Sequence, residues 1–487
     1  MTYPGPVPIP PPTPPTPPAF PELRDSDDVQ GNILAGFRKD RQSFLFVQLA
    51  DQASGRTWLS ELAPRLASTR QVATFNASFS RARRAGGGDP EDLGAVWVNL
   101  GLTAQGVQLL ANTALLSPEP GDDPYLNGAH NRAAITGDAG PSAADNWLFG
   151  RSEQRIHAVL IVAADRATDL QSELARQRES LARHGATLVF EQAGATLTGA
   201  RRGHEHFGFK DGISQPGVVG FDEEDEATPG QVKDRPGTDL VAAGEFVLGY
   251  PDQSGAASTL EWLRNGSFLV IRRLVQDVPG WWAQMIEQAS ADQEQGGLKP
   301  DQLAAKAVGR WRSGSPLDKA PEADRRSGRD SSQDNNFDYA NDEDGVRTPR
   351  FAHIRKVYPR NSPTPGEAEA QRHRIIRRGI PFGLQFDPAE GRGHGVDGPR
   401  GLIFAAYMAD IARGFEFLQQ RWANAVDFPE EADGADPVIG PSSVATIHRE
   451  DGPVRQVAFG QFVRTGGALY AFSPSISTIG RLSRGEL

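Results

Sequence analysis

The sequence predicts an α+β fold made of two ferredoxin-like domains with antiparallel sheets. In the first half, apolar stretches typical of strands occur in pairs separated by single helical patterns, which is the order of a split β–α–β unit and not of a doubly wound parallel sheet. In the second half this order starts again, because "SFLVIRRLVQD" (267–277) is similar to "SFLFVQLAD" (43–51). An acidic stretch lies between the halves, so we expect domains at 23–221 and 241–487 joined by a linker at 222–240.

In the first domain, short apolar or alternating runs predict strands and amphipathic spacing predicts helices. "SFLFVQLA" is a continuous apolar run typical of a buried strand, whereas "RTWLSELAPRLA" carries apolar residues at helical intervals. The expected strands are 43–50, 72–80, 94–101, 156–164 and 186–192, and the expected helices are 56–67, 103–112 and about 165–184.

The second domain shows the same two kinds of pattern. "GLIFAAYMA" is an apolar run typical of a strand, and "IARGFEFLQQRWANA" has helical spacing. The expected strands are 267–277, 373–383, 401–409 and 468–474, and the expected helices are 279–289 and 411–425.

The composition is that of a soluble globular protein, with 487 residues of which 38% are hydrophobic and 23% charged. The net charge of −11 argues against nucleic acid or an anionic membrane surface as a partner. Residues 1–22 are rich in proline and are expected to form a disordered leader. The leader lacks the basic start and apolar run of a secretory signal, and no stretch has the roughly 20 apolar residues of a membrane span. We therefore expect a cytoplasmic protein, with an extracellular location as the alternative if a signal was removed.

The absence of cysteine restricts the possible cofactor chemistry. It excludes disulfides, thiolate nucleophiles, iron–sulfur clusters and thiolate-ligated haem. No two of the nine histidines have the spacing of zinc enzymes, whereas a single histidine suits haem iron, because the porphyrin supplies four further donors. His353 is the leading candidate, since "RFAHIRKVYPR" surrounds it with cations that could neutralise haem propionates. The alternative from these residues alone is a basic edge strand with an incidental histidine.

Two short motifs resemble those of dye-decolourising peroxidases. "HIRKVYPR" (353–360) resembles the proximal-histidine motif of that family, and "GFKDG" (208–212) resembles its distal Gly-x-x-Asp-Gly motif. Further blocks that look like the family follow in the expected order along most of the chain, namely "VQGNILAGFRKD", "GRWRSGSPL", "NNFDYANDEDG", "RRGIPFG" and "DPVIG". The "VQGNIL" block near the start resembles the larger members of the family.

The resemblance implies a haem b cofactor (iron protoporphyrin IX) placed between the sheet and the helices of the C-terminal domain. It implies His353 as the axial ligand of the iron, Asp211 as the distal acid and Arg377 as the distal arginine, with Arg378 as the adjacent alternative. The other implied residues are Arg360, which pairs with a propionate, Asp436, which accepts the second N–H of the proximal imidazole, and Leu402 and Phe404, which wall the distal pocket. The chain departs from the family at two places, since many relatives have Asn where Tyr358 stands and Cys-Pro where Thr348-Pro349 stands. Neither departure is at a catalytic position, so they affect only the expected local packing.

The "HFGFKDGISQP" stretch (206–216) fits such a distal site. Gly208 and Gly212 would let the backbone pass close to the porphyrin, while the neighbouring phenylalanines pack behind it. Asp211 could then move a proton between the two oxygens of hydrogen peroxide if its pocket excludes water, and Arg377 would stabilise the negative charge on the departing oxygen.

The implied reducing substrates are bulky aromatic dyes and phenols. Because Leu402 and Phe404 would leave room for little more than peroxide, electrons are expected to leave through an exposed side chain, and Trp422 and Tyr339 are the candidates because each lies in a polar run. Three alternatives remain: a haem-handling, deferrochelatase-like protein that would not need the distal pair, a relative acting on chlorite, and a scaffold that uses the proline-rich leader. No nucleic-acid or membrane partner is expected, and the sequence does not indicate an oligomeric state.

Overall fold

The computed structural model describes residues 22–90, 93–112, 122–290, 297–325, 330–386, 398–450 and 453–487. The expected proline-rich leader lies, apart from Glu22, outside the described residues. Among the helices of the described residues, none is long and apolar enough to cross a membrane.

The N-terminal half forms an antiparallel sheet in the order β4-β1-β3-β2. One helical connection joins β1 to β2 and another joins β3 to β4, so each pair of parallel strands is separated in space by an antiparallel neighbour. This is the ferredoxin-like order that the sequence predicted. The elements are β1 (Arg41–Gln48), α2 (Gln52–Leu62), β2 (Val96–Leu102), α4 (Ala104–Leu110), β3 (Ala158–Ala164), α6 (Ala167–Arg183) and β4 (Thr187–Ala195).

The C-terminal half repeats this order as β13-β7-β10-β8, with β9 paired to the end of β10. β1 and β7 therefore hold the same place in their halves, in line with the similarity between their sequences. The single strand expected at 373–383 is two short strands with a break between them. The elements are β7 (Ser267–Gln276), α7 (Val278–Ser290), β8 (Ile376–Arg377), β9 (Ile380–Phe382), β10 (Gly401–Met408) and β13 (Val463–Ser473).

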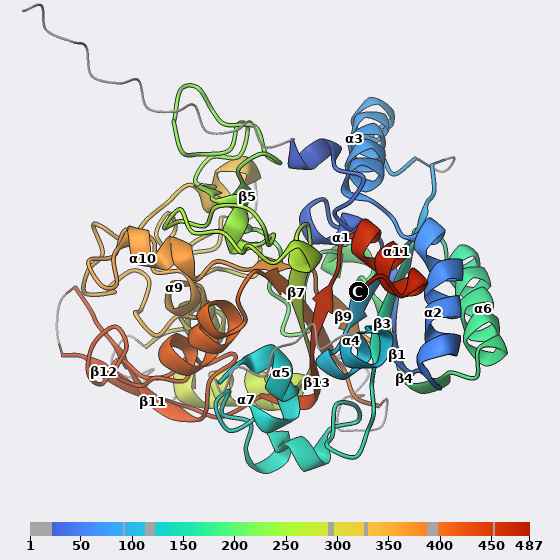
Figure 1. The fold of residues 1–487 in the computed structure, drawn as a ribbon. Coiled ribbons are helices and arrows are strands. Elements are labelled where there is room, and N and C mark those ends of the chain that lie inside the picture. Colours follow the sequence, from blue (N-terminus) through green and yellow to red (C-terminus); the bar gives the residue numbers. More distant parts are fainter. Residues whose placement is uncertain are drawn as a thin grey trace, which may run out of the picture.

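The two halves share one sheet, which confirms the predicted fold class and adds how the halves join. β2 and β13 meet through the pairing of Leu102 with Phe472. At the opposite ends β4 lies against β9, where Gly194 comes close to Ile380 and Pro381. Figure 1 shows α2 and α6 side by side on the outer face of the N-terminal strands, while α9 and α10 lie on the other side of the molecule.

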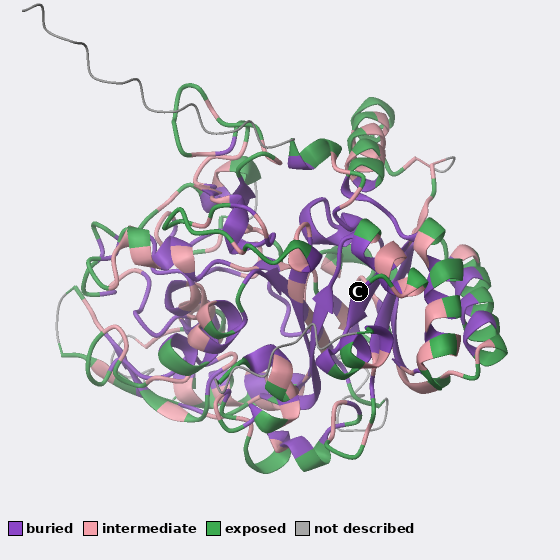
Figure 2. Cartoon of the chain, viewed as in Figure 1, coloured by how far each residue is buried: buried purple, intermediate pink, exposed green. Residues whose placement is uncertain are grey.

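The segment 72–80 is helical, so its prediction as a strand was wrong. It lies within α3 (Thr69–Gly86), which begins at a capping box in which Ser68 and Gln71 satisfy each other's backbone N–H groups. Only Thr69 and Val72 of this helix are buried, and Figure 2 shows α3 projecting from the body with a largely exposed surface. A short apolar-polar alternation in a mostly exposed helix has the same pattern as a half-buried strand, and the start of the helix was decided by its cap.

The other elements are short. His353 begins α9, a helix and not the edge strand considered as its alternative. The helix expected at 411–425 is present as two π-helical segments, η11 (Ala412–Glu416) and η12 (Leu418–Ala423). The remaining elements are α1 (Gly31–Leu34), α5 (Pro124–Asn131), β5 (Gly217–Val218), β6 (Leu240–Val241), α8 (Pro300–Val308), α9 (His353–Val357), α10 (Glu367–Arg372), β11 (Ser443–Ile447), β12 (Arg455–Phe459) and α11 (Ile476–Arg484).

The sheet has an apolar core on each face. Along β1, Leu45 and Val47 pack toward the core that contains Trp58 of α2, whereas Phe46 points to the opposite core and stacks on Phe149 with ring centroids 4.0 Å apart. Because successive side chains of a strand point to opposite faces, the continuous apolar run of β1 reflects burial on both sides.

Candidate active site

One cavity of about 270 Å³ brings together residues from both halves of the chain. The N-terminal half contributes the loop 205–216, and the C-terminal half contributes one face of β7, β10 and β13 together with α9 and the π-helical segments. Among the residues proposed from the sequence, the following line it: Asp211, His353, Arg360, Arg377, Leu402 and Phe404. The structure thus gathers residues that are up to about two hundred positions apart in the chain.

His353 is held by Asp436. Its Nδ1 lies 2.7 Å from Oδ2 of Asp436, whose side chain is fully buried. The other carboxylate oxygen accepts the backbone N–H groups of Val438 at 2.8 Å and Ile439 at 3.2 Å. Since a carboxylate is an acceptor, Nδ1 carries the proton and Nε2 keeps its lone pair for a ligand in the cavity.

The electrostatics of His353 follow from this pair. Burial alone lowers the pKa of the imidazole, but the adjacent Asp436 carboxylate outweighs burial and raises it above the usual value. Arg377 and Asp211 line the same cavity and act on the pKa of His353 with opposite signs, since Arg377 lowers it and Asp211 raises it.

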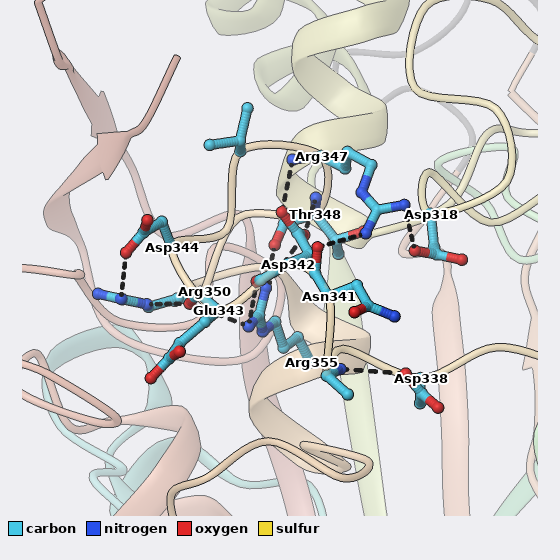
Figure 3. Close-up of polar contacts among 12 residues, drawn as sticks. Asp318, Asp338, Asn341, Asp342, Glu343, Asp344, Arg347, Thr348, Arg350 and Arg355 are labelled. Atoms are coloured by element: carbon cyan, nitrogen blue, oxygen red, sulfur yellow. Dashed lines mark hydrogen bonds and ion pairs between the residues drawn. The ribbon is translucent and has the colours of Figure 1, made fainter. Parts of the chain in front are cut away.

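A buried carboxylate fixes the turn that leads into α9. Asp342 accepts the backbone N–H groups of Arg347 at 3.0 Å and Thr348 at 2.8 Å, and it forms an ion pair with Arg355 at 3.3 Å (Figure 3). Arg355 in turn donates to the Thr348 carbonyl at 2.7 Å. Because Arg355 belongs to α9, these contacts tie the helix that carries His353 to the preceding loop.

Asp211 and Arg377 form an ion pair at the cavity. Nη1 of Arg377 lies 3.2 Å from Oδ1 of Asp211, and its Nη2 donates to the Ser214 carbonyl at 2.7 Å. The Asp211 carboxylate also accepts the N–H of Gly212 at 2.6 Å. Its side chain is 40% exposed in the protein chain.

Arg377 and Arg378 have different environments, which settles which of them faces the cavity. Arg378 is turned away and donates to the carbonyls of Asn32, Ile33 and Leu34 in the N-terminal half. Arg377, the last residue of β8, instead reaches the loop of Asp211, where it contacts Asp211 and the Ser214 carbonyl.

The loop around Asp211 is held in shape by glycines and by a second acid. Gly208 has φ +101° and Gly212 has φ +75°, a region that favours glycine. Phe207 packs behind the loop, where its ring stacks on Trp281 at 4.8 Å. Glu205 accepts the backbone N–H groups of Phe207 and Phe209, each at 2.8 Å, and thereby bridges the turn.

Cations outnumber carboxylates at one end of the cavity. Arg360 is buried and donates to the carbonyls of Asn335 at 2.8 Å and Phe337 at 3.0 Å. Arg310 lies nearby, and burial together with the charge of Arg360 lowers its pKa to about 9. A third guanidinium, that of Arg374, lines the same cavity.

Trp422 and Tyr339 are buried, so their prediction as partly exposed side chains was wrong. Trp422 is 2% exposed and packs between Phe417 and Phe428, and Tyr339 is fully buried beneath Arg355. The polar neighbours in the sequence point to solvent or form internal hydrogen bonds, so local polarity does not report the exposure of an aromatic ring.

The residues of the cavity fit haem. A single imidazole with a free Nε2 suits iron whose other donors come from a porphyrin. Leu274, Leu402 and Phe404 provide an apolar wall, and the guanidinium groups of Arg310 and Arg360 supply positive charge for carboxylates. If haem is bound in this cavity, His353 would hold the iron and Arg360 would face a propionate.

The sequence analysis missed some residues of this site. Glu205, Arg310 and Arg374 line the cavity but were not proposed. Each lies in or beside a motif that had been singled out, "HFGFKDGISQP", "GRWRSGSPL" and "RRGIPFG", so a charged residue in an otherwise apolar or glycine-rich motif was the available indication.

Comparison with known proteins identifies the family on both halves of the chain. Residues 28–195 match the family model described as "DyP dimeric alpha+beta barrel domain", and residues 252–432 match the one described as "Dyp-type peroxidase, C-terminal". The first match contains β1 to β4 and the second contains β7 to β10.

Relatives extend the similarity over nearly the whole chain. "Dye-decolorizing peroxidase AauDyP1" of Auricularia auricula-judae is 33% identical over 94% of this chain and 87% of its own length, and "Multifunctional dye peroxidase DyP2" of Amycolatopsis sp. is 33% identical over 85% of each. A solved structure of an ancestral D-type dye decolorizing peroxidase superposes with a TM-score of 0.79 at 31% identity, covering 94% of this chain and 98% of that one. With both halves matched and a third of the residues shared along the length, the chain belongs to the dye-decolorizing peroxidase family, whose members are haem enzymes.

Proposed function

We propose that this peroxidase uses hydrogen peroxide to oxidise bulky dyes and phenolic compounds, with haem b as its cofactor. The observation that supports this best is that His353, which is paired with Asp436, and the Asp211–Arg377 pair line one cavity. The first pair suits an axial ligand, and the second supplies an acid–base group and a fixed positive charge.

The distal pair is proposed to act on peroxide. Asp211 takes the proton of one peroxide oxygen and returns it to the other, so that the departing oxygen leaves as water. Arg377 is held by Asp211 and the Ser214 carbonyl, and it stabilises the negative charge on that departing oxygen. Haem, when bound, supplies the two electrons that reduce peroxide and later takes them back from the dye or phenol.

The proximal pair is proposed to adjust the cofactor. Asp436 accepts the Nδ1 proton of His353 and makes the imidazole a stronger electron donor. The Val438 and Ile439 N–H groups hold the carboxylate in place, so the imidazole ring keeps its orientation.

The experiment compares the ferric spectrum and the rate of reaction with peroxide in four variants. His353→Ala should lose the normal haem spectrum. Asp211→Asn should bind haem but react with peroxide about 10²–10⁴-fold more slowly, and Arg377→Leu about 10²–10³-fold more slowly. The exposed Asp145→Asn is the matched control and should behave like the wild type.

A wild-type protein with no Soret band after supply of haem would refute the proposal. A wild type that binds haem but reacts with peroxide no faster than the two distal variants would instead favour a haem-handling protein. We do not favour that alternative, because haem transport would have no use for the pairing of Asp211 with Arg377.

A further inference from the structure

Three guanidinium groups at one end of the cavity have no carboxylate partner among the described residues. Arg310 and Arg360 donate to backbone carbonyls, and Arg360 also bonds the Asn335 side chain and Ser214 Oγ at 3.2 Å. The hydrogen bond of Arg374 is a long one, 3.5 Å to Gln371 Oε1, although the guanidinium has five N–H donors.

The aromatic ring of Tyr358 orients Arg374. The guanidinium carbon lies 3.6 Å from the centroid of this ring, close enough for a cation–π contact. The ring itself is anchored at its hydroxyl, which bonds the carboxylates of Asp239 and Glu367 and accepts the amide N–H of Gln371 at 3.0 Å. A fixed ring stacked on a guanidinium sets the orientation of the guanidinium plane. The N–H groups at the edge of the guanidinium then remain available to an acceptor in the cavity.

The carboxylates that line the cavity are already engaged. Asp138 pairs with Arg272, and Asp211 pairs with Arg377. Glu205 bridges the distal loop through backbone N–H groups. None of the three therefore pairs with Arg374 or its neighbours, and the carboxylates of Asp239 and Glu367 are bonded to the Tyr358 hydroxyl instead. A buried cation without a direct carboxylate partner is unfavourable.

We propose that Arg374, oriented by the ring of Tyr358, is a carboxylate-binding residue of the cavity, and that the carboxylate it binds is a propionate of the haem. This inference rests on the proposed function, because it requires haem in the cavity. Arg360, whose guanidinium lies 5.0 Å from the centroid of the same ring, then faces the second propionate. The two arginines share one aromatic platform and give the cavity a dianion-binding end.

The test compares two cofactors that differ only in the carboxylates. The full chain is freed of haem and titrated, by the Soret band, with haem and with haem dimethyl ester, in which both propionates are neutral. Arg374→Gln should weaken binding of haem about 10–100-fold, the usual effect of losing a charge-assisted hydrogen bond. It should leave the affinity for the dimethyl ester unchanged.

Three further variants separate orientation from general damage. Tyr358→Phe keeps the ring and should retain most of the preference for haem over its ester, whereas Tyr358→Leu removes the platform and should lose it. Arg372→Gln is the matched control, because this substitution removes the same charge two positions away. Arg372 is 40% exposed and is paired with Glu369. It should leave both affinities at the wild-type values.

An equal loss of affinity for both cofactors in Arg374→Gln would overturn the proposal, since it would mean a structural role. An unchanged haem-to-ester ratio together with weaker binding of benzoate to the loaded protein would also overturn it, because the carboxylate would then belong to a substrate. A wild-type chain that binds neither cofactor would instead refute the proposed function itself.

Discussion

At the scale of single residues, Asp436 is the side chain whose contacts define its role most sharply. One of its oxygens accepts from His353 and the other accepts two backbone N–H groups. In Asp436→Asn the carbonyl oxygen is expected to keep the backbone contacts, so the amide NH₂ turns toward the imidazole and no longer accepts its proton. The imidazole then donates less to the iron, and we expect a higher reduction potential and about 10–100-fold lower activity.

Spectroelectrochemical titration measures that potential. Asp433→Asn is the control, because Asp433 is buried nearby but contacts Arg350 and the backbone of Glu430 instead of His353. A potential that shifts equally in both variants would assign the effect to charge alone and not to the hydrogen bond.

Glu205 gives a pH dependence to the distal loop. Burial raises the pKa of its carboxyl above the usual value, against the opposing effect of Gln276 and the backbone N–H groups of Phe209 and Phe207. A raised pKa in the folded state means that the folded protein holds a proton that the unfolded chain releases. This contribution to stability is complete below the unfolded pKa and is lost as the pH rises through the folded pKa.

Melting temperatures of the wild type and Glu205→Gln should therefore diverge with pH. From pH 4.5 upward the melting temperature of the wild type should fall relative to that of the variant, which cannot ionise at this position. The same comparison with the exposed Glu226→Gln should give a constant difference. A constant difference for Glu205→Gln as well would mean that folding does not raise the pKa of its carboxyl.

The site residues that the sequence could indicate are those with a motif around them. His353, Asp211 and Arg377 lie in such motifs, and the structure places all three at one cavity. Arg374 lies just before the "RRGIPFG" motif, but its role depends on the ring of Tyr358, which is sixteen positions away and is brought to it by the fold. The burial of Trp422 was likewise decided by tertiary contacts with Phe417 and Phe428.

At the scale of elements, the turn before α9 determines where His353 lies. Asp342→Ala would remove the acceptor for two backbone N–H groups and leave the buried Arg355 without its partner. Breaking a buried ion pair from one side costs about 3–5 kcal/mol. We expect that loss in denaturant titrations, together with a lower haem content.

The neighbouring acid provides the control. Asp344 is drawn in the same turn in Figure 3, but its side chain is 77% exposed and pairs with Arg350 at 3.3 Å. Asp344→Ala should cost no more than about 1 kcal/mol, as is usual for exposed ion pairs. Equal losses in the two variants would contradict the special role given to Asp342.

Elements with a long apolar pattern could be predicted from the sequence. Elements that are very short, or whose start depends on a capping residue, could not. β1, β3 and β10 follow apolar runs that only a buried strand explains. The exposed helix α3 depends on its cap at Ser68, and α9 has only five residues, too few to show a periodicity.

At the scale of the whole molecule, the repeat of one strand order in both halves was indicated by the sequence, but the joining of the halves was not. The contact of β4 with β9 depends on Gly194, whose backbone lies against Ile380 and Pro381. A pattern within one strand carries no information about a partner nearly two hundred residues away, so this seam could be found only in the folded structure.

The seam gives a test of how far the two halves stabilise each other. A Cβ at position 194 would lie 2.5 Å from Cγ2 of Ile380 and 3.0 Å from the carbonyl oxygen of Pro381, so Gly194→Ala must push β9 outward. Overpacking of this kind costs about 1–3 kcal/mol, and we expect a lower denaturant midpoint. Gly86→Ala at the end of α3 is the control, because a Cβ there has no neighbour within 4 Å, and its midpoint should stay or rise. An unchanged midpoint in Gly194→Ala would show that β9 can move away from β4 without cost, and that this contact does not help to hold the two halves together.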